Sequence, residues 1–270
     1  MEVIEKINLE IPFFVSDGLE AAGGIAHGFS TRVGGVSEGM WAGLNLGATR
    51  GDDPDHVREN CRRFFAAIGA AGDHLARTNQ VHGDGVRVIT TADSQTDICE
   101  KVNYEADALI TAIPGITLMV TVADCVPILL YDPVRRVVAA VHSGWRGTAE
   151  GVVTRTVERM VDVYGCRPED ILAAIGPSIG PEHFETHEDV PNAMMASLAT
   201  QALHYIQIKE NGKFSVDLKG LNHLRLTQAG LTEDHIAVST ECTACDSEKY
   251  WSHRRCGNDR GAMVAAIQLL

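Results

Sequence analysis

The chain has 270 residues, 45% of them hydrophobic and 22% charged, which is enough to bury a core that can hold a rigid site. Its formal net charge of −13 argues against a nucleic acid or an anionic membrane as the main partner. Seven scattered cysteines, an N-terminus without an apolar leader and the absence of any apolar run of about 18 residues favour a soluble cytoplasmic protein.

The predicted elements are short strands and helices, without internal repeats or long linkers. Residues 1–28 carry no functional signal and are expected to add an edge strand. In chain order, we then expect a helix over 56–68, strands over 86–91, 116–123, 128–131 and 137–141, a helix over about 148–164, a strand over 171–175, a helix over about 219–229, and strands over 236–240 and 262–269. Helices separate some of these strands but not all, which favours mixed sheets. The expected fold is α+β, a sandwich of mixed β-sheets flanked by helices, in a single domain spanning residues 1–270.

Three reactive side chains stand next to predicted strands. Cys125 interrupts an apolar run, His142 ends a strand before a glycine turn, and His82 precedes a strand. A sheet holds residues at its strand ends rigidly while letting them face a cleft, which suits a functional site.

Two imidazoles and a thiolate are a sound ligand set for a catalytic zinc ion, which takes three protein ligands and keeps one position open. Such an ion can activate water or polarise a substrate atom. The three residues form no recognisable short motif, so ordinary core roles remain open for each of them. A thiol nucleophile also fits, with Cys125 attacking, His142 as its base and Asp124 orienting the base. Neighbouring residues of a strand point to opposite faces, however, which weakens the assignment of Asp124.

Nine blocks of the sequence occur in the order typical of one protein family. They are FSTRVGGVS (29–37), LNLG (44–47), GDD (51–53), NQVHG (79–83), EADALIT (105–111), VADCVPILLYDP (122–133), AAVHSGWRGT (139–148), AIGPSIGP (174–181) and SHRR (252–255). By these blocks, the chain resembles the bacterial polyphenol-oxidase or laccase-domain proteins, now regarded as purine nucleoside phosphorylases. The match extends from about Phe29 to Ile267, and the DC and HSGWRG blocks at their mutual spacing are its most specific part.

The resemblance implies a fold, a metal site and an activity. It implies two mixed sheets between helices, with one zinc ion held in a cleft by His82, Cys125 and His142 as the catalytic centre. It further implies phosphorolysis of adenosine, inosine, guanosine and 5′-methylthioadenosine, with adenosine deamination as an additional activity. Purine nucleosides and inorganic phosphate are therefore the expected partners, and the sequence identifies no protein partner.

Phosphorolysis requires groups that hold a phosphate dianion. Arg32 lies in a glycine-bounded loop, and Arg146 follows His142 by four residues at the entrance to a predicted helix. Arg254 and Arg255 in SHRR are further candidates. A surface salt bridge is the alternative for each of the four.

Two aspartates lie next to the expected zinc ligands and are candidates for supporting roles. Zinc deaminases use a glutamate in an H-x-E motif, and none follows His82 or His142. Asp84, two residues after His82, is a candidate acid/base or a support for the ligands, although a turn-forming role in HGDG is favoured. Asp124, beside Cys125, is the second candidate support.

Two further groups of potential ligands occur in the last third of the chain. His183 and His187 are four residues apart, but the preceding GPSIGP favours loop or cap roles over a second metal site. Cys242, Cys245, His253 and Cys256 spell C-x2-C-x7-H-x2-C, which is compatible with a structural zinc ion. Reduced cysteines near the cleft are the favoured interpretation.

Three rival functions follow from the same residues. A copper-dependent polyphenol oxidoreductase fits because two histidines and a cysteine also bind copper. Against it, the multicopper laccases use H-x-H pairs, and none of the eleven histidines here forms one. A metal-free cysteine hydrolase using Cys125 and His142 is the second rival. Nucleoside binding without turnover is the third.

Overall fold

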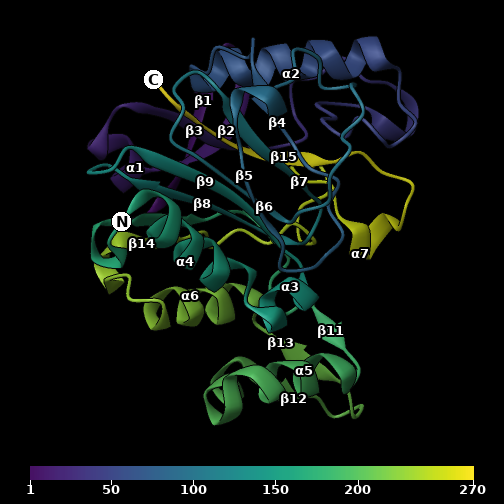
Figure 1. The fold of residues 1–270 in the computed structure, drawn as a ribbon. Coiled ribbons are helices and arrows are strands. Elements are labelled where there is room, and N and C mark those ends of the chain that lie inside the picture. The colour runs from purple at the N-terminus through teal and green to yellow at the C-terminus, as the bar shows by residue number, and fades with distance from the viewer.

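Two six-stranded β-sheets pack face to face between helices in the computed structural model, which describes residues 1–270 (Figure 1). This arrangement confirms the expected α+β sandwich of mixed sheets flanked by helices. No helix is both long enough and apolar enough to cross a bilayer.

The first sheet has the strand order β1-β2-β3-β15-β7-β4. Its strands are β1 (Val3–Asn8), β2 (Ile11–Ser16), β3 (Ile25–Ser30), β15 (Met263–Leu269), β7 (Thr117–Val122) and β4 (Leu75–Ala76). All neighbours pair antiparallel except β4, which runs parallel to β7. Residues 1–28 thus supply an edge strand, β1, as expected, and also β2 and the first part of β3.

The second sheet has the strand order β14-β10-β8-β9-β6-β5. Its strands are β14 (Ile236–Val238), β10 (Leu172–Ile175), β8 (Val126–Asp132), β9 (Val137–Ser143), β6 (Ala108–Thr111) and β5 (Val86–Val88). The two outer pairs, β14 with β10 and β5 with β6, are parallel, and the inner pairs are antiparallel.

Side-chain alternation along the strands divides the core into layers. In β7, Leu118 and Val120 point between the two sheets, whereas Met119 points to the outer side of the first sheet. In β8, Leu129 faces the first sheet and Leu130 faces the helices on the other side. The sequence of each strand is therefore a nearly continuous apolar run, because each strand is buried on both faces.

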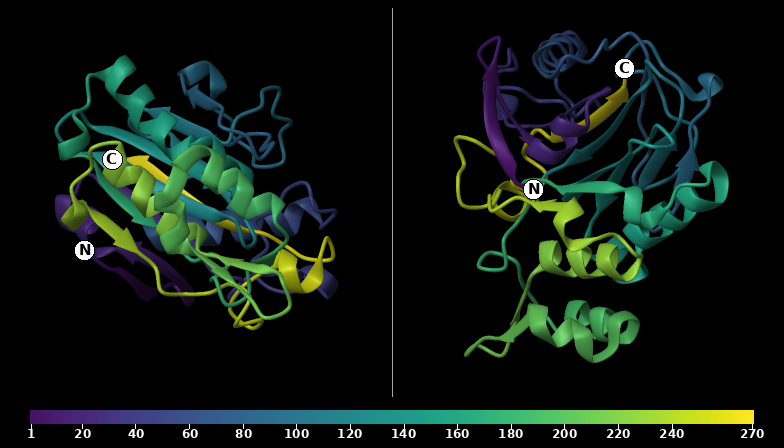
Figure 2. Two further views of the ribbon diagram at one scale, coloured as in Figure 1. Left: turned by 90° about the horizontal axis from the view of Figure 1, so that it is seen from below. Right: turned by 90° about the vertical axis from the view of Figure 1, so that its left-hand side faces the viewer.

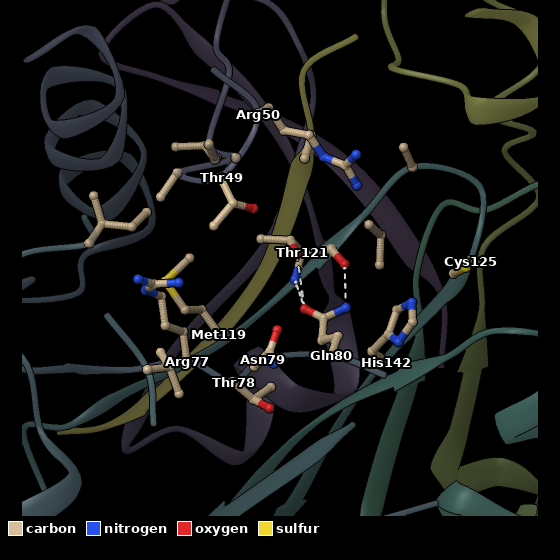
Figure 3. Close-up of a pocket in the computed structure, with 18 of the residues that line it drawn as sticks. Thr49, Arg50, Arg77, Thr78, Asn79, Gln80, Met119, Thr121, Cys125 and His142 are labelled. Carbon is tan, nitrogen blue, oxygen red and sulfur yellow. Dashed lines mark hydrogen bonds between the residues drawn. The ribbon is translucent and has the colours of Figure 1, made fainter. Parts of the chain in front are cut away.

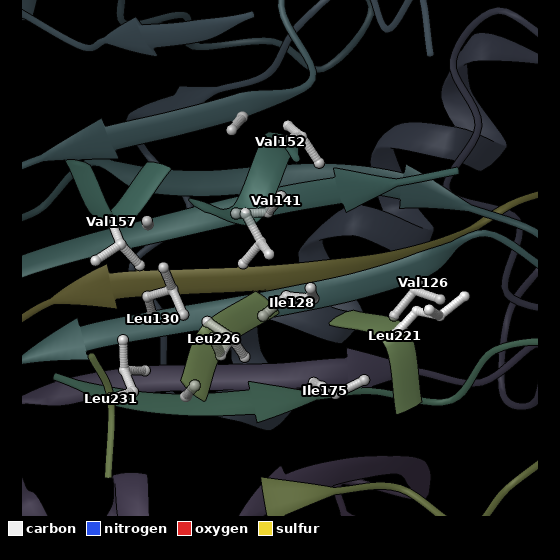
Figure 4. Packing of buried hydrophobic residues seen from close by; sticks show 14 of the residues in the cluster. Val126, Ile128, Leu130, Val141, Val152, Val157, Ile175, Leu221, Leu226 and Leu231 are labelled. Atoms are coloured by element: carbon white, nitrogen blue, oxygen red, sulfur yellow. The ribbon is translucent and has the colours of Figure 1, made fainter. Parts of the chain in front are cut away.

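Helices cover the outer faces of both sheets. The predicted first helix is confirmed as α2 (Pro54–Ile68), which begins with an Asp53 cap and ends at left-handed Gly69. It lies over the first sheet, while α4 (Val152–Tyr164) and α6 (Leu218–Gln228) lie over the second. Figure 4 shows their apolar side chains packed against those of β8, β9 and β10. A short helix, α1 (Asp17–Ala22), joins β2 to β3.

The single helix expected over about 148–164 is wrong, because two helices cover this region. They are α3 (Trp145–Glu150) and α4, and they are separated by Gly151. Gly151 has a φ of +85°, which ends one helix and redirects the next. The first of them, α3, begins directly after Gly144, beside the expected metal ligands.

A small lobe formed by residues 185–216 was not predicted. It contains the sheet β11 (Glu185–Thr186), β13 (Phe214–Val216) and β12 (Ile206–Ile208), together with α5 (Asp189–Leu198) (Figures 1 and 2). The last helix, α7 (His253–Cys256), consists of a single turn and contains most of SHRR.

Candidate metal centre and cavity

His82, Cys125 and His142 meet where the chain crosses between the two large sheets. His82 lies in the connection from β4 to β5, and Cys125 lies in the connection from β7 to β8; both connections lead from the first sheet to the second. His142 lies in β9 opposite Pro127 of β8, and is therefore close to the start of β8. Its ligand atom and those of His82 and Cys125 all lie within 4.8 Å of one another. The topology thus assembles the donor set predicted from the sequence.

The buried carboxylate of Asp107 holds two of these residues in place. It accepts hydrogen bonds from the backbone N–H groups of Val81, His82 and Gly83 at 3.2, 3.0 and 2.8 Å. These bonds stabilise the loop in which His82 adopts a left-handed φ of +62°. Although burial raises the pKa of Asp107, the bonds from His142 and from this loop lower it below its ordinary value.

The same carboxylate fixes the ring of His142. Asp107 Oδ1 lies 2.8 Å from His142 Nδ1, so Nδ1–H donates and Nε2 is left for another partner. This is the arrangement by which carboxylates orient metal-binding histidines in many proteins. Asp107 lies in the block EADALIT, but it is not among the site residues predicted from the sequence.

Cys125 and His142 stabilise each other's charged forms. Burial raises the pKa of the Cys125 thiol, but the positive charge of His142 and hydrogen bonds from His142 and His82 outweigh it and lower the pKa to about 6. Burial lowers the pKa of His142, but the charges of Cys125 and Asp107 raise it to about 9. The thiolate, which is the form that binds metals, is therefore favoured near neutral pH.

Gly144 leaves space beside all three donors. A Cβ atom at this position would lie 3.0 Å from His82 Cδ2, 3.3 Å from Cys125 Sγ and 3.8 Å from His142 Cε1. Any other residue would press on the donor set. The chemistry of the donors, their convergence and this cradle together fit a metal ion with an open coordination position.

The two candidate supporting aspartates have partners outside the donor set. Asp124 has a left-handed φ of +85° and accepts hydrogen bonds from Thr243 Oγ1 at 2.7 Å, Ser252 Oγ at 3.0 Å and Arg254 N at 2.6 Å. The carboxylate that bonds to His142 is therefore Asp107 and not Asp124. Asp84 forms a partly exposed ion pair with Arg155 of α4 at 2.9 Å.

The donor set opens into a cavity of about 470 Å³. Figure 3 shows Cys125 and His142 at one end and Arg77 and Met119 at the other. Between them, the Gln80 amide forms three hydrogen bonds with Thr121 of β7, all between 2.8 and 2.9 Å. These bonds tie the loop that carries His82 to the sheet.

The four arginines selected from the sequence do not line this cavity. Arg32, Arg254 and Arg255 donate to backbone carbonyl groups, and Arg32 also stacks on an aromatic ring. Arg146 lies in the first turn of α3 with its guanidinium 4.3 Å from the centre of the Trp145 ring. Their assignment to phosphate binding stays a prediction.

Three other arginines, Arg50, Arg77 and Arg260, line the cavity and form no ion pair with a carboxylate. Arg50 is exposed, whereas Arg260 is buried and donates to the carbonyl groups of Gly257 and Gly261. Burial and the positive charge of Arg50 lower the pKa of Arg260 to about 10. Guanidinium groups without carboxylate partners on the cavity wall favour an anion bound beside them. Arg50 directly precedes the matched block GDD, and this position was the signal in the sequence that could have identified it as a site residue.

The C-x2-C-x7-H-x2-C group is only partly brought together. Cys242 and Cys245 lie side by side, but His253 Nδ1 bonds to the carbonyl of Gly257, and neither His253 nor Cys256 joins them. Their nearest potential ligands are instead Glu182 and His183.

The fold and the site define a class of protein, a mixed-sheet sandwich with a His–Cys–His donor centre at the end of a polar cavity. The chain belongs to the family described as "Multi-copper polyphenol oxidoreductase laccase", which matches residues 26–270. This family membership confirms the resemblance indicated by the nine sequence blocks.

Relatives with the name purine nucleoside phosphorylase match most of the chain. A "Purine nucleoside phosphorylase" of Deinococcus radiodurans is 42% identical over 91% of this chain and 89% of its own length. "Purine nucleoside phosphorylase YfiH" of Escherichia coli is 38% identical over 92% of this chain and 95% of its own length. Among solved structures, YlmD from Geobacillus stearothermophilus superimposes with a TM-score of 0.91 and 31% identity, covering 99% of each chain.

Proposed function

We propose that this chain is a zinc-dependent purine nucleoside phosphorylase that also deaminates adenosine. The proposed phosphorolysis substrates are adenosine, inosine, guanosine and 5′-methylthioadenosine, and the products are the free base and the ribose 1-phosphate, or its methylthio analogue. Deamination would replace the amino group at C6 of adenosine with the oxygen of water and release ammonia. Relatives that carry the phosphorylase name support the first activity.

One observation carries the proposal: the cavity has metal donors at one end and cationic groups without carboxylate partners on its wall. Its volume of about 470 Å³ suits a small-molecule ligand of nucleoside size. Arg50 and Arg260 would hold the phosphate dianion by charge and by N–H donors. His82, Cys125 and His142 would hold the zinc ion, which supplies a Lewis acid for charge that develops as the glycosidic bond breaks.

The roles of the chain's own groups follow from their positions. Asp107 would keep His142 Nδ1 protonated and its Nε2 directed to the donor centre. In phosphorolysis, a phosphate oxygen forms a bond to C1′ of the ribose while the bond from C1′ to the base nitrogen breaks. Holding phosphate and nucleoside together in one cavity makes this step effectively intramolecular.

Copper is the alternative metal, because the same donors bind it. Blue-copper centres often add a weak axial methionine, and Met119 is not placed for that role, because it lies at the opposite end of the cavity from Cys125 (Figure 3). Metal analysis of the purified protein would decide between zinc and copper.

A metal-free cysteine hydrolase is the second candidate function, and a specific observation favours it. Cys125, His142 and Asp107 form the series of thiol, base and orienting acid that nucleophilic catalysis requires. This candidate predicts turnover that resists chelators and is abolished by thiol alkylation.

Adenosine is expected to yield adenine and ribose 1-phosphate only when phosphate is present, in proportion to the zinc content of the protein. The measurement is chromatography of the reaction products, paired with metal analysis of the same preparation. Inosine formed without phosphate would establish deamination. Absence of turnover of any purine nucleoside by zinc-loaded protein would leave the family membership intact and contradict the proposed activity.

Replacing Arg50 with glutamine is expected to raise the KM for phosphate by about tenfold with a smaller change in kcat, since a charge-assisted hydrogen bond contributes about 1.5–3 kcal/mol. Arg50 is exposed, so the fold should tolerate the change. Arg62→Gln, on the outer surface of α2, is the matched control. An unchanged KM for phosphate would remove Arg50 from the binding site.

A further inference from the structure

A second cluster of metal-binding side chains lies outside the cavity, on the loops 176–187 and 239–246. It consists of Glu182, His183, Cys242 and Cys245, whose ligand atoms all lie within 4.8 Å of one another. None of these residues lines the cavity or belongs to the His82–Cys125–His142 centre. The cluster therefore requires its own explanation.

The distances within the cluster match those of a tetrahedral metal site. His183 Nδ1 lies 3.6 Å from Cys242 Sγ and 3.5 Å from Cys245 Sγ. Glu182 Oε1 lies 3.7 Å from Cys245 Sγ and 3.5 Å from His183 Nδ1. Tetrahedral zinc, with bonds of about 2.0–2.3 Å, needs its ligand atoms about 3.3–3.8 Å apart.

The backbone holds the four ligands in this arrangement. A bridge pairs Ser178 with Cys242, and the Thr243 N–H donates to the Ser178 carbonyl at 3.0 Å. A turn closed by the Cys245 N–H and the Cys242 carbonyl brings the two thiols of the C-x2-C pair to one side. The Gly180 N–H points to Cys242 Sγ at 3.1 Å, which stabilises a thiolate.

Gly180 also makes room for the carboxylate ligand. A Cβ atom at this position would lie 2.2 and 2.4 Å from the two Glu182 carboxylate oxygens. The glycine thus lets Glu182 fold back over the loop toward the thiols. Two soft thiolates with an imidazole and a carboxylate select a divalent transition-metal ion of the zinc type over magnesium or calcium.

We propose that Glu182, His183, Cys242 and Cys245 bind a second zinc ion, with a structural role. All four positions are filled by the protein, as in structural rather than catalytic sites. The ion would join two loops that are about 60 residues apart in sequence.

This second site is connected to the first one. Thr243, between the two cysteines, donates its hydroxyl to Asp124 Oδ1, and Asp124 directly precedes Cys125. Arg254 adds a second link, since its backbone bonds to Asp124 and its guanidinium bonds to the His183 carbonyl. An ion bound at the second site would therefore stabilise the loop that carries Cys125.

The test uses the full chain with the first centre removed by Cys125→Ala, so that any remaining cobalt–thiolate absorption reports the second site. Metal-free protein, kept reduced, is titrated with Co²⁺ and followed by its absorption spectrum. We expect one equivalent of Co²⁺ to bind and to give thiolate charge-transfer bands. Adding Cys242→Ser and Cys245→Ser should abolish the binding and the bands. Adding Cys256→Ser, the matched control, should leave the binding and the bands unchanged.

The chain with Cys125 intact provides an independent measurement. Its zinc stoichiometry should be two, falling to one in the Cys242→Ser, Cys245→Ser variant, and Glu182→Gln should weaken binding of the second ion only. The proposal is overturned if the Cys125→Ala chain binds no cobalt, if binding survives loss of both cysteines, or if the two thiols form a disulfide under reducing conditions. The outcome does not depend on whether nucleosides are substrates.

Discussion

Cys125→Ala is expected to remove the metal ion of the cavity and to lower nucleoside turnover by roughly 1000-fold, because a metal ion supplies several kcal/mol of transition-state stabilisation. The change deletes the one thiolate among the three donors and leaves two histidines, of which His142 stays bonded to Asp107. Two histidines alone hold a divalent ion much less tightly than the full set.

The fold should survive this substitution. Cys125 lies in a connection between strands and its loss removes only a small side chain, so the far-ultraviolet circular dichroism spectrum should match that of the unmodified chain. Metal analysis and the phosphate-dependent assay give the readouts, with Cys256→Ser as the control. A folded, metal-free Cys125→Ala protein with full turnover would eliminate the zinc mechanism.

Asp107→Asn is expected to weaken metal binding by about 10–100-fold, the usual effect of removing a carboxylate that orients a histidine ligand. An asparagine side chain has one acceptor oxygen in place of two, so it cannot serve both the three N–H groups of the His82 loop and Nδ1 of His142. The Kd for zinc, measured by competition with a chelator, should rise accordingly.

Excess zinc distinguishes a positioning role for Asp107 from a purely structural one. If Asp107 acts through His142, saturating metal should restore much of the lost turnover, and the pKa of His142 measured by NMR in the metal-free chain should fall because a negative partner is gone. Asp170→Asn, on the surface beside Arg167, is the matched control. An unchanged Kd would show that Asp107 does not support the ligands.

The layers of the fold could be predicted from local sequence patterns. The elements that differ from the prediction depend on tertiary context. Apolar runs at 116–123 and 137–141 predict buried strands, and both are confirmed as β7 and β9. The break at Gly151 was missed because an isolated glycine inside a helical pattern can be tolerated and does not by itself mark the end of a helix. The sheet of residues 185–216 was missed because its strands have only two or three residues, too few to show an alternating pattern.

The residues of the site also divide into those that local sequence patterns predict and those that depend on tertiary context. The donor residues were recognisable as reactive side chains next to apolar strands. Asp107, Arg50 and Arg260 were not, because their roles depend on which crossovers meet in space. The C-x2-C pair was recognised, but its partners were assigned to the following sequence. The actual neighbours, Glu182 and His183, lie on the loop whose Ser178 pairs with Cys242, and no local pattern encodes this pairing.

The position of β15 has a consequence for the order of assembly. This strand, from the last residues of the chain, lies in the interior of the first sheet, between β3 and β7. During synthesis, β7 therefore has no partner on that side until residues 263–269 have been made. Cys125 follows β7 within a few residues, so the proposed donor set would be fully ordered only after β15 has paired with β7, by which point both histidines have emerged.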